Sequence, residues 1–218
     1  MLAYRLRAWV ATAAALLALA AGAAVPPAAP ATLLVVGDSL SAGYGIRVEE
    51  GWVALLAHRL EAQAYGYRVV NASVSGETSL GALERLPHLL ERDRPAVVIL
   101  ELGGNDGLRA LPTADLETHL GRMVELSKAA GAGVVLLGVA MPANYGPDYT
   151  AKFAAVYPAV AARYHVPLVR SLIEPLGSDL ANFQADGVHP TAAVQPQLVD
   201  HVWPALAPVL KAHRPAGH

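Results

Sequence analysis

The sequence predicts an α/β protein with a three-layer, flavodoxin-like fold. Short apolar runs rich in valine and leucine alternate along the chain with longer segments of helical periodicity. This alternation is typical of a parallel sheet with helices on both faces. The strand-like runs are largely apolar, as expected for strands buried on both sides. Five such runs favour the strand order 2-1-3-4-5, and a length of 218 residues favours one domain.

The five strands of this sheet are expected at residues 32–36, 67–70, 96–102, 134–139 and 167–170. The first is a β-rich run that stops at Gly37, a residue that often ends a strand at a turn. The others are bounded by glycine, proline or polar residues in the same way. Their length of four to seven residues matches ordinary buried strands.

Helices are expected at residues 52–63, 78–92, 116–130, 151–164 and 192–210. Each repeats apolar residues at helical spacing, so one face of each helix should pack on the sheet. The second should turn a row of leucines inward, at positions 80, 83, 86 and 90. Proline removes a helical hydrogen bond. We therefore expect Pro87 to bend or divide the second helix, and three prolines to interrupt the last: Pro196, Pro204 and Pro208.

The first 23 residues have the features of an export signal. Arg5 and Arg7 give a basic start, residues 8–21 carry no charge, and Ala21-Gly22-Ala23 offers the small residues that signal peptidase accepts. The apolar run is shorter than the roughly 20 residues of a membrane-spanning helix. We expect a cleaved signal at residues 1–23 and a flexible leader at residues 24–30, rather than a retained anchor. With either, the protein is exported and is periplasmic or secreted.

Composition excludes several classes of function. The chain has no cysteine, which excludes disulfides, thiol catalysis, zinc–thiolate sites and iron–sulfur clusters. Its net charge is −2 and it has no basic run, so we expect no nucleic-acid partner. No pair of histidines has metal-ligand spacing, and we expect neither metal nor cofactor. A monomer without stable membrane insertion is the expected state after signal cleavage.

Polar residues follow the predicted strands where each strand ends. Ser39 follows the first strand, Gly76 follows the second, and Asn105 follows the third. Asp186 and His189 lie in the loop before the last helix. Ligands of open parallel sheets bind beyond the carboxyl ends of the strands, so these loops can meet at one edge. We therefore expect the five residues to form one site.

These residue types are the parts that acyl transfer requires. A serine hydroxyl needs an adjacent base, which His189 can supply, and Asp186 can hold the imidazole in one tautomer. The backbone amides of Ser39 and Gly76 and the side chain of Asn105 can donate to an oxyanion. No single loop is specific, because Asp186-x-x-His189 is also an ordinary turn before a helix. The neighbouring serines are rival nucleophiles, at positions 41, 73, 75 and 79.

Taken together, the blocks resemble the GDSL, or SGNH, hydrolase superfamily. These blocks are Gly37-Asp38-Ser39-Leu40, the Gly76 loop, Gly104-Asn105-Asp106 and Asp186-Gly187-Val188-His189. The resemblance implies an SGNH hydrolase domain at residues 31–213, with a disordered tail at residues 214–218. It also implies the roles given above: Ser39 as nucleophile, Asp186 and His189 as its partners in a triad, and Gly76 and Asn105 as oxyanion donors.

Longer stretches are similar to the bacterial periplasmic thioesterases and lysophospholipases of that superfamily. These stretches are residues 37–44, 71–79, 101–109, 142–146 and 186–190. This similarity implies hydrolysis of acyl esters, acyl thioesters and lysophospholipids. It further implies that Pro142, Asn144 and Tyr145 border the acyl-chain groove. An exported enzyme would seldom meet acyl-CoA, which favours esters or lysophospholipids as substrates. Two alternatives stay open: a carbohydrate O-deacetylase of the same superfamily, and a non-catalytic lipid-binding protein.

Overall fold

The computed structural model describes residues 29–141 and 143–214, and it contains the predicted five-stranded parallel sheet. The strand order is β2-β1-β3-β4-β5. The strands are β1 (Ala31–Gly37), β2 (Tyr67–Asn71), β3 (Val97–Glu101), β4 (Gly133–Leu137) and β5 (Leu168–Val169). The expected signal at residues 1–23 lies outside the described residues, as do most of the leader and residues 215–218 of the tail.

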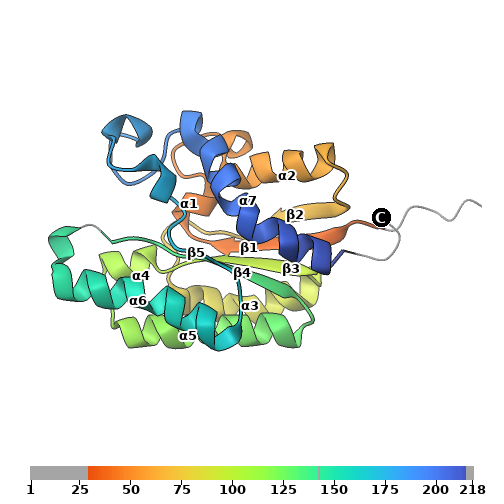
Figure 1. The fold of residues 1–218 in the computed structure, drawn as a ribbon, viewed down its shortest axis with the longest axis horizontal. Helices are drawn as coiled ribbons and strands as arrows, with labels where there is room; N and C mark the ends of the chain where they lie inside the picture. Colours follow the sequence, from red (N-terminus) through yellow and green to blue (C-terminus); the bar gives the residue numbers. More distant parts are fainter. Residues whose placement is uncertain (1–28, 142, 215–218) are drawn as a thin grey trace, which may run out of the picture.

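Helices cover both faces of the sheet, which gives the three layers seen in Figure 1. One face carries α2 (Trp52–Ala62) and α7 (Gln195–Ala212). The other carries α3 (Ser79–Asp93), α5 (Thr113–Ala129) and α6 (Pro147–Tyr164). Two short helices begin where strands end: α1 (Ser39–Ala42) after β1 and α4 (Gly104–Leu108) after β3. The 3-10 turns are Val48–Glu50, Ala143–Tyr145, Glu174–Leu176, Leu180–Asn182 and Ala192–Val194.

The apolar core has two halves, one on each side of the sheet. Alternate residues of β1 point to opposite faces, as strand geometry requires. Leu33 and Val35 pack in the cluster that contains α2 and α7, whereas Leu34 and Val36 pack against α3, α5 and α6. All four are fully buried. This double burial explains why the strand is apolar without alternation.

The carboxyl ends of the central strands lie level with one another. Gly37 of β1 is paired in register with Glu101 of β3, and Glu101 with Leu137 of β4. The segments that follow β1, β3 and β4 therefore leave the sheet at one edge, on the left in Figure 1. The sheet places the Ser39 and Asn105 loops side by side by this register alone.

The expected division of helices at proline was wrong, and so was the inward orientation of Leu80. The structure keeps α3 and α7 as continuous helices through Pro87, Pro204 and Pro208, and Pro196 lies within the first turn of α7, where proline is tolerated. The three interior prolines lie on exposed positions, where water can bind the carbonyl that each leaves unpaired. Leu80, expected to face inward, is 49% exposed, because it belongs to the first turn of α3 at the edge of the sheet.

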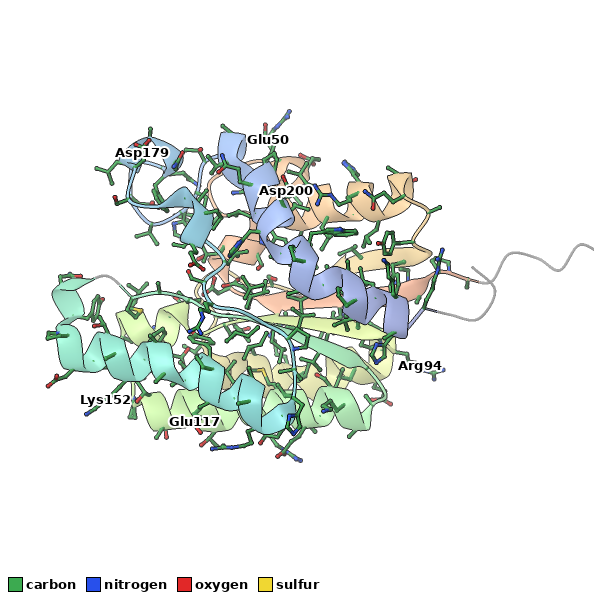
Figure 2. All side chains as sticks on the ribbon, in the orientation of Figure 1. Glu50, Arg94, Glu117, Lys152, Asp179 and Asp200 are labelled. Carbon is green, nitrogen blue, oxygen red and sulfur yellow. The ribbon has the colours of Figure 1, made fainter. Side chains whose placement is uncertain are left out.

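Most charged side chains lie on the outside of the described structure; Asp38, Glu101 and Asp106 are buried. Figure 2 labels six of the outer ones on widely separated elements, and all point away from the core. Exposed ion pairs join neighbouring helices or turns, such as Arg163 with Glu117 at 2.7 Å. Among the described residues, no helix has the length and apolar character needed to cross a membrane.

Candidate active site

Ser39 is placed at the sheet edge by the abrupt change from β1 to α1. Asp38 caps this short helix, because its Oδ1 accepts a hydrogen bond of 3.0 Å from the backbone amide of Leu40. Gly43 ends the helix in the left-handed conformation, with φ of 76°. Ser39 is the first helical residue, and its side chain faces the pocket described below.

Gly37 permits this turn through close approach. A Cβ at this position would lie 2.8 Å from the Oγ of Ser41 and 2.9 Å from the Oε2 of Glu101. Real Cβ atoms do not come so close to such atoms, so any larger residue would force these two side chains apart. The strand end can therefore pack against both polar groups only as glycine.

Asp186 organises the loop that carries His189. Its Oδ1 accepts hydrogen bonds from the backbone amides of Val188 at 2.9 Å and His189 at 3.0 Å. Gly187 between them has φ of 67°, a conformation that favours glycine. The backbone amide of His189, that of Val188 and the imidazole, in this order, lower the pKa of Asp186 to about 2. The carboxylate is therefore charged at neutral pH.

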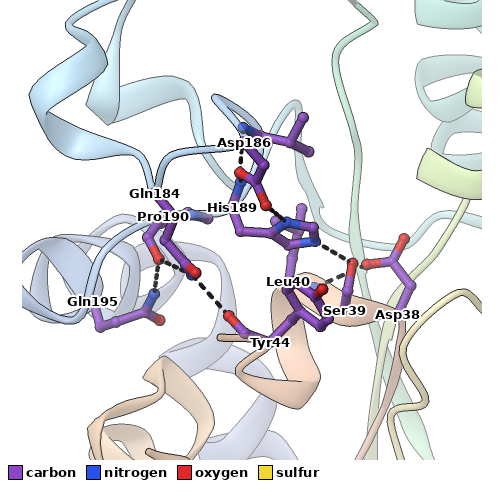
Figure 3. Close-up of polar contacts among 10 residues, drawn as sticks. Asp38, Ser39, Leu40, Tyr44, Gln184, Asp186, His189, Pro190 and Gln195 are labelled. Carbon is purple, nitrogen blue, oxygen red and sulfur yellow. Dashed lines mark hydrogen bonds and ion pairs between the residues drawn. The ribbon is translucent and has the colours of Figure 1, made fainter. Parts of the chain in front are cut away.

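A hydrogen-bonded chain runs from Asp186 through His189 to Ser39 (Figure 3). The Oδ2 of Asp186 lies 2.7 Å from the Nδ1 of His189. The opposite ring nitrogen, Nε2, lies 2.8 Å from the Oγ of Ser39. A charged carboxylate only accepts, so Nδ1 donates to it and Nε2 accepts from the serine hydroxyl. This arrangement can remove a proton from Ser39 as the hydroxyl attacks a carbonyl carbon.

Three residues outside the sequence-based set support this chain. The ring of Tyr44 packs on the ring of His189, with centroids 4.5 Å apart. The Nε2 of Gln184 donates to the backbone carbonyl of Tyr44 at 2.7 Å and to that of Pro190 at 3.1 Å. The loop of Ser39 and the loop of His189 are thereby fastened together, although they lie far apart in the sequence.

Asn105 and Gly76 lie at the same pocket as Ser39 and His189. The Nδ2 of Asn105 donates a hydrogen bond of 3.2 Å to the Oδ2 of Asp38. Gly76 has φ of 82°, and its carbonyl accepts from Arg109 at 3.1 Å. The predicted residues Ser39, Gly76, Asn105 and His189 all line one pocket, and Asp186 supports it from behind His189.

The helix that carries Asn105 is fixed by its neighbour Asp106. This buried carboxylate accepts from the backbone amide of Ser79 at 2.9 Å and from the Ser79 hydroxyl at 2.5 Å. The same hydroxyl lies 2.9 Å from the Nδ1 of His119. Ser79 is fully buried, so this second serine, histidine and aspartate group cannot meet a substrate. It instead joins α4 to the first turn of α3.

Two buried acids lie directly beneath Ser39. Asp38 is 2% exposed and Glu101 is fully buried. Burial raises the pKa of Asp38 to about 6, and burial together with the charge of Asp38 raises that of Glu101 well above its usual range. Ser41 donates to the Oε2 of Glu101 at 2.7 Å, while Oε1 has no partner among the described residues. Glu101 is therefore the member of the pair that holds a proton.

The pocket at Ser39 has a volume of about 600 Å³ and is mostly apolar. Its walls include Leu108, Met141, Ile173, Leu180, Phe183 and Val188. No periodic pattern points to Ile173, Leu180 or Phe183, because residues 172–183 form short turns. Within the described ranges, no three histidine or acidic side chains come together as metal ligands.

The three residues expected to border the groove have different locations. Asn144 is exposed, and neither it nor Tyr145 lines the pocket. The hydroxyl of Tyr145 donates at 3.1 Å to the carbonyl of Leu108, whose side chain does line it. Pro142 lies outside the described residues, although its neighbour Met141 is part of the pocket wall.

Comparison with known proteins identifies the family. A model of the GDSL-like lipase/acylhydrolase family matches residues 35–195. The esterase TesA of Pseudomonas aeruginosa is 52% identical over 183 residues, covering 84% of this chain and 91% of that protein. The thioesterase 1/protease 1/lysophospholipase L1 of Escherichia coli K12 is 41% identical over 183 residues, covering 84% of this chain and 86% of that protein.

A solved structure agrees with the sequence comparison. The crystal structure of TesA is 52% identical, covers 82% of this chain and 99% of its own, and superposes with a TM-score of 0.80. The family match at residues 35–195 spans all four loops that meet at the pocket. On these grounds, the chain belongs to the GDSL-like lipase/acylhydrolase family.

Proposed function

We propose that the chain is a serine hydrolase of carboxylic esters and thioesters, with Ser39 as nucleophile. The single observation that carries this proposal is the chain of two hydrogen bonds from Asp186 to His189 and from His189 to Ser39, at 2.7 and 2.8 Å. In the first step Ser39 attacks the acyl carbonyl while the Nε2 of His189 takes its proton. His189 then protonates the departing alcohol or thiol.

The second step reverses the first with water. Water attacks the acyl-enzyme as His189 removes its proton, and Ser39 leaves with the proton returned. Each tetrahedral intermediate carries a negative oxygen, which needs fixed donors. The backbone amides of Ser39 and Gly76 and the side chain of Asn105 are the donors that we assign. The charged Asp186 stabilises the imidazolium that forms in both steps.

The lining of the pocket supports a fatty-acyl substrate. Its aliphatic and aromatic walls can bury an acyl chain, which contributes about 0.8 kcal/mol per methylene removed from water. A carbohydrate O-deacetylase would need polar groups for sugar hydroxyls, and outside the proposed catalytic groups this lining supplies few, such as Ser75 and Ser178. Octanoyl and acetyl p-nitrophenyl esters separate the two functions: we expect the octanoyl ester to have the higher kcat/KM, and preference for acetyl would favour the deacetylase.

The relatives suggest the range of substrates, since they are named esterase, thioesterase and lysophospholipase. We propose that residues 1–23 direct export, that residues 24–30 are a leader, and that the enzyme acts as a monomer in the periplasm or as a secreted protein. At that location esters and lysophospholipids are the substrates, because acyl-CoA is cytoplasmic. Residues 142–146 are proposed to border the entering acyl chain from the side of Met141.

Replacement of Ser39 tests the catalytic assignment. Ser39→Ala should lower the kcat for p-nitrophenyl octanoate by roughly 10⁴-fold or more, because no nucleophile remains. Its thermal unfolding should match that of the unchanged protein, and it should not react with a fluorophosphonate probe. Ser41→Ala is the matched control, because Ser41 is buried against Glu101. It should keep fluorophosphonate labelling. Near-normal turnover by Ser39→Ala would reject Ser39 as the nucleophile, whereas absence of turnover and labelling in the unchanged protein would favour a non-catalytic lipid-binding protein.

A further inference from the structure

Large exposed apolar side chains gather at one edge of the sheet. Among the side chains that the structure describes, eight large apolar ones are exposed, and we call them the apolar rim: Tyr44, Val48, Val74, Leu80, Leu108, Leu111, Leu180 and Val188. Two of them follow β1, two follow β2, two follow β3 and two follow β5. Every member therefore lies in a segment that leaves the carboxyl end of a strand.

Other surfaces of the described structure have a different character. The outward faces of the helices carry ion pairs, including Arg122 with Glu125 at 2.9 Å and Arg163 with Glu117 at 2.7 Å. Glu117 of α5 and Lys152 of α6 point away from the core in Figure 2. The large exposed apolar side chains therefore gather on one side of the molecule. On an ordinary surface such side chains are scattered singly.

The apolar rim is continuous with the pocket. Four of its members also line the pocket that contains Ser39: Tyr44, Leu108, Leu180 and Val188. Leu180 has the largest exposed fraction of the eight, 74%. An acyl chain could thus leave an apolar phase, cross the rim and reach Ser39 without passing through water.

We propose that the apolar rim docks reversibly on the surface of a zwitterionic lipid aggregate and draws the acyl chain from it. The inference rests on the proposed function, because the rim leads into the proposed acyl pocket. The net charge of −2 gives no attraction to anionic lipid, so burial of the rim side chains drives the contact. The rim side chains would enter the lipid only to the headgroup boundary. This contact differs from insertion of a spanning helix.

The test uses rim residues that do not line the pocket. The double variant Leu80→Ser with Leu111→Ser should partition about 10-fold more weakly onto vesicles of phosphatidylcholine, measured by flotation of the exported chain without residues 1–23. Its kcat/KM for p-nitrophenyl butyrate, a soluble ester, should equal that of the unchanged protein, because neither residue lines the pocket. Equal partition of the variant and the unchanged protein would overturn the proposal.

A matched control separates docking through the rim from nonspecific hydrophobic adsorption. Ala129 is exposed at the end of α5, at the opposite edge of the sheet, so Ala129→Leu adds an apolar side chain that faces away from the rim. Its partition should match that of the unchanged protein. If Ala129→Leu raised partition as strongly as the rim variant lowered it, the binding would have no direction and the proposal would fail.

Two further measurements keep this proposal distinct from the catalytic one. Ser39→Ala should partition like the unchanged protein while it loses turnover, so failure of docking and failure of catalysis are read separately. Partition should also change little between low and high salt, since it does not depend on charge attraction. Loss of partition in high salt, or a rim that instead joins two copies of the chain in gel filtration, would contradict a lipid partner.

Discussion

The side-chain amide of Asn105 donates a hydrogen bond of 3.2 Å to the Oδ2 of Asp38, the residue directly before Ser39. The Oδ1 of Asp38 is occupied by the backbone amide of Leu40. One carboxylate therefore fixes the start of α1 and decides which end of the Asn105 amide faces it. Since an amide nitrogen has two hydrogens, the second remains available to the pocket. Asp38 is thus a positioning residue for the proposed oxyanion donor.

Replacement of this carboxylate should affect kcat more than KM. In Asp38→Asn the new amide competes with Asn105, which must turn its oxygen toward position 38 to keep a hydrogen bond. The oxyanion then loses the Asn105 donor. We expect kcat for p-nitrophenyl octanoate to fall roughly 10- to 100-fold, with KM changed little. An equal rise in KM with unchanged kcat would show that Asp38 acts on substrate binding instead.

The unfolding free energy of Asp38→Asn, compared with that of the unchanged protein, should rise with pH. Asp38 has a pKa of about 6 in the folded protein and 3.8 as its ordinary value, so folding favours its protonated form. Its contribution to stability is complete below pH 3.8 and is lost as the pH rises through about 6. Asp38→Asn is neutral throughout, so its unfolding free energy relative to the unchanged protein should rise between pH 4 and pH 8, by up to about 3 kcal/mol. Urea unfolding at the two pH values measures this difference; no change would contradict the burial argument.

Glu101 provides a neighbouring test, because one of its oxygens has no partner among the described residues. Glu101→Gln keeps an acceptor for the Ser41 hydroxyl and copies the protonated acid, so turnover should stay within about 2-fold. Glu101→Ala removes the acceptor and leaves a cavity, and it should lower the unfolding free energy by about 2–4 kcal/mol. If the glutamine variant were as unstable as the alanine variant near pH 7, Glu101 would have to be ionised there.

Removal of the Asn105 side chain tests the oxyanion assignment directly. Asn105→Ala should lower kcat by roughly 10²–10³-fold, the usual effect of losing one donor. Its thermal unfolding should change little, because Asp106 continues to join α4 to Ser79. Ser39 should still react with a fluorophosphonate, though more slowly. A loss of kcat below about 3-fold would leave the two backbone amides as the only donors that matter.

The fold was predictable because its signals are local and strong. Largely apolar runs mark the strands in the sequence. The rule that ligands bind beyond the carboxyl ends of strands predicted a shared location for Ser39, Gly76, Asn105 and His189, and all four line one pocket. Contacts between distant side chains gave no such signal. Tyr44 had no pattern that pointed to His189, and the walls supplied by residues 172–183 come from irregular turns. Leu80 followed helical spacing, but spacing cannot tell a first turn at the sheet edge from a buried one.

The hydrogen bonds of Gln184 can also be tested, since they join two loops that are far apart in the sequence. Gln184→Ala removes the donors to the carbonyls of Tyr44 and Pro190, and should lower the unfolding free energy by about 1–2 kcal/mol. Because His189 then drifts relative to Ser39, we expect kcat and the rate of fluorophosphonate labelling to fall together by about 10-fold. KM for p-nitrophenyl octanoate should stay unchanged.

Gly45 offers an independent route to the same displacement. A Cβ at Gly45 would lie 2.0 Å from the Oε1 of Gln184, and the φ of Gly45 is 75°. Gly45→Ala must therefore push the Gln184 side chain away while leaving its chemistry intact, and it should reproduce the kinetic loss of Gln184→Ala. The two changes act on one contact, so the double variant should be no slower than the worse single variant. Additive losses in kcat would mean that Gly45 and Gln184 influence Ser39 and His189 by separate routes. The hydrogen bonds of Gln184 between the two loops would then not set the distance between Ser39 and His189.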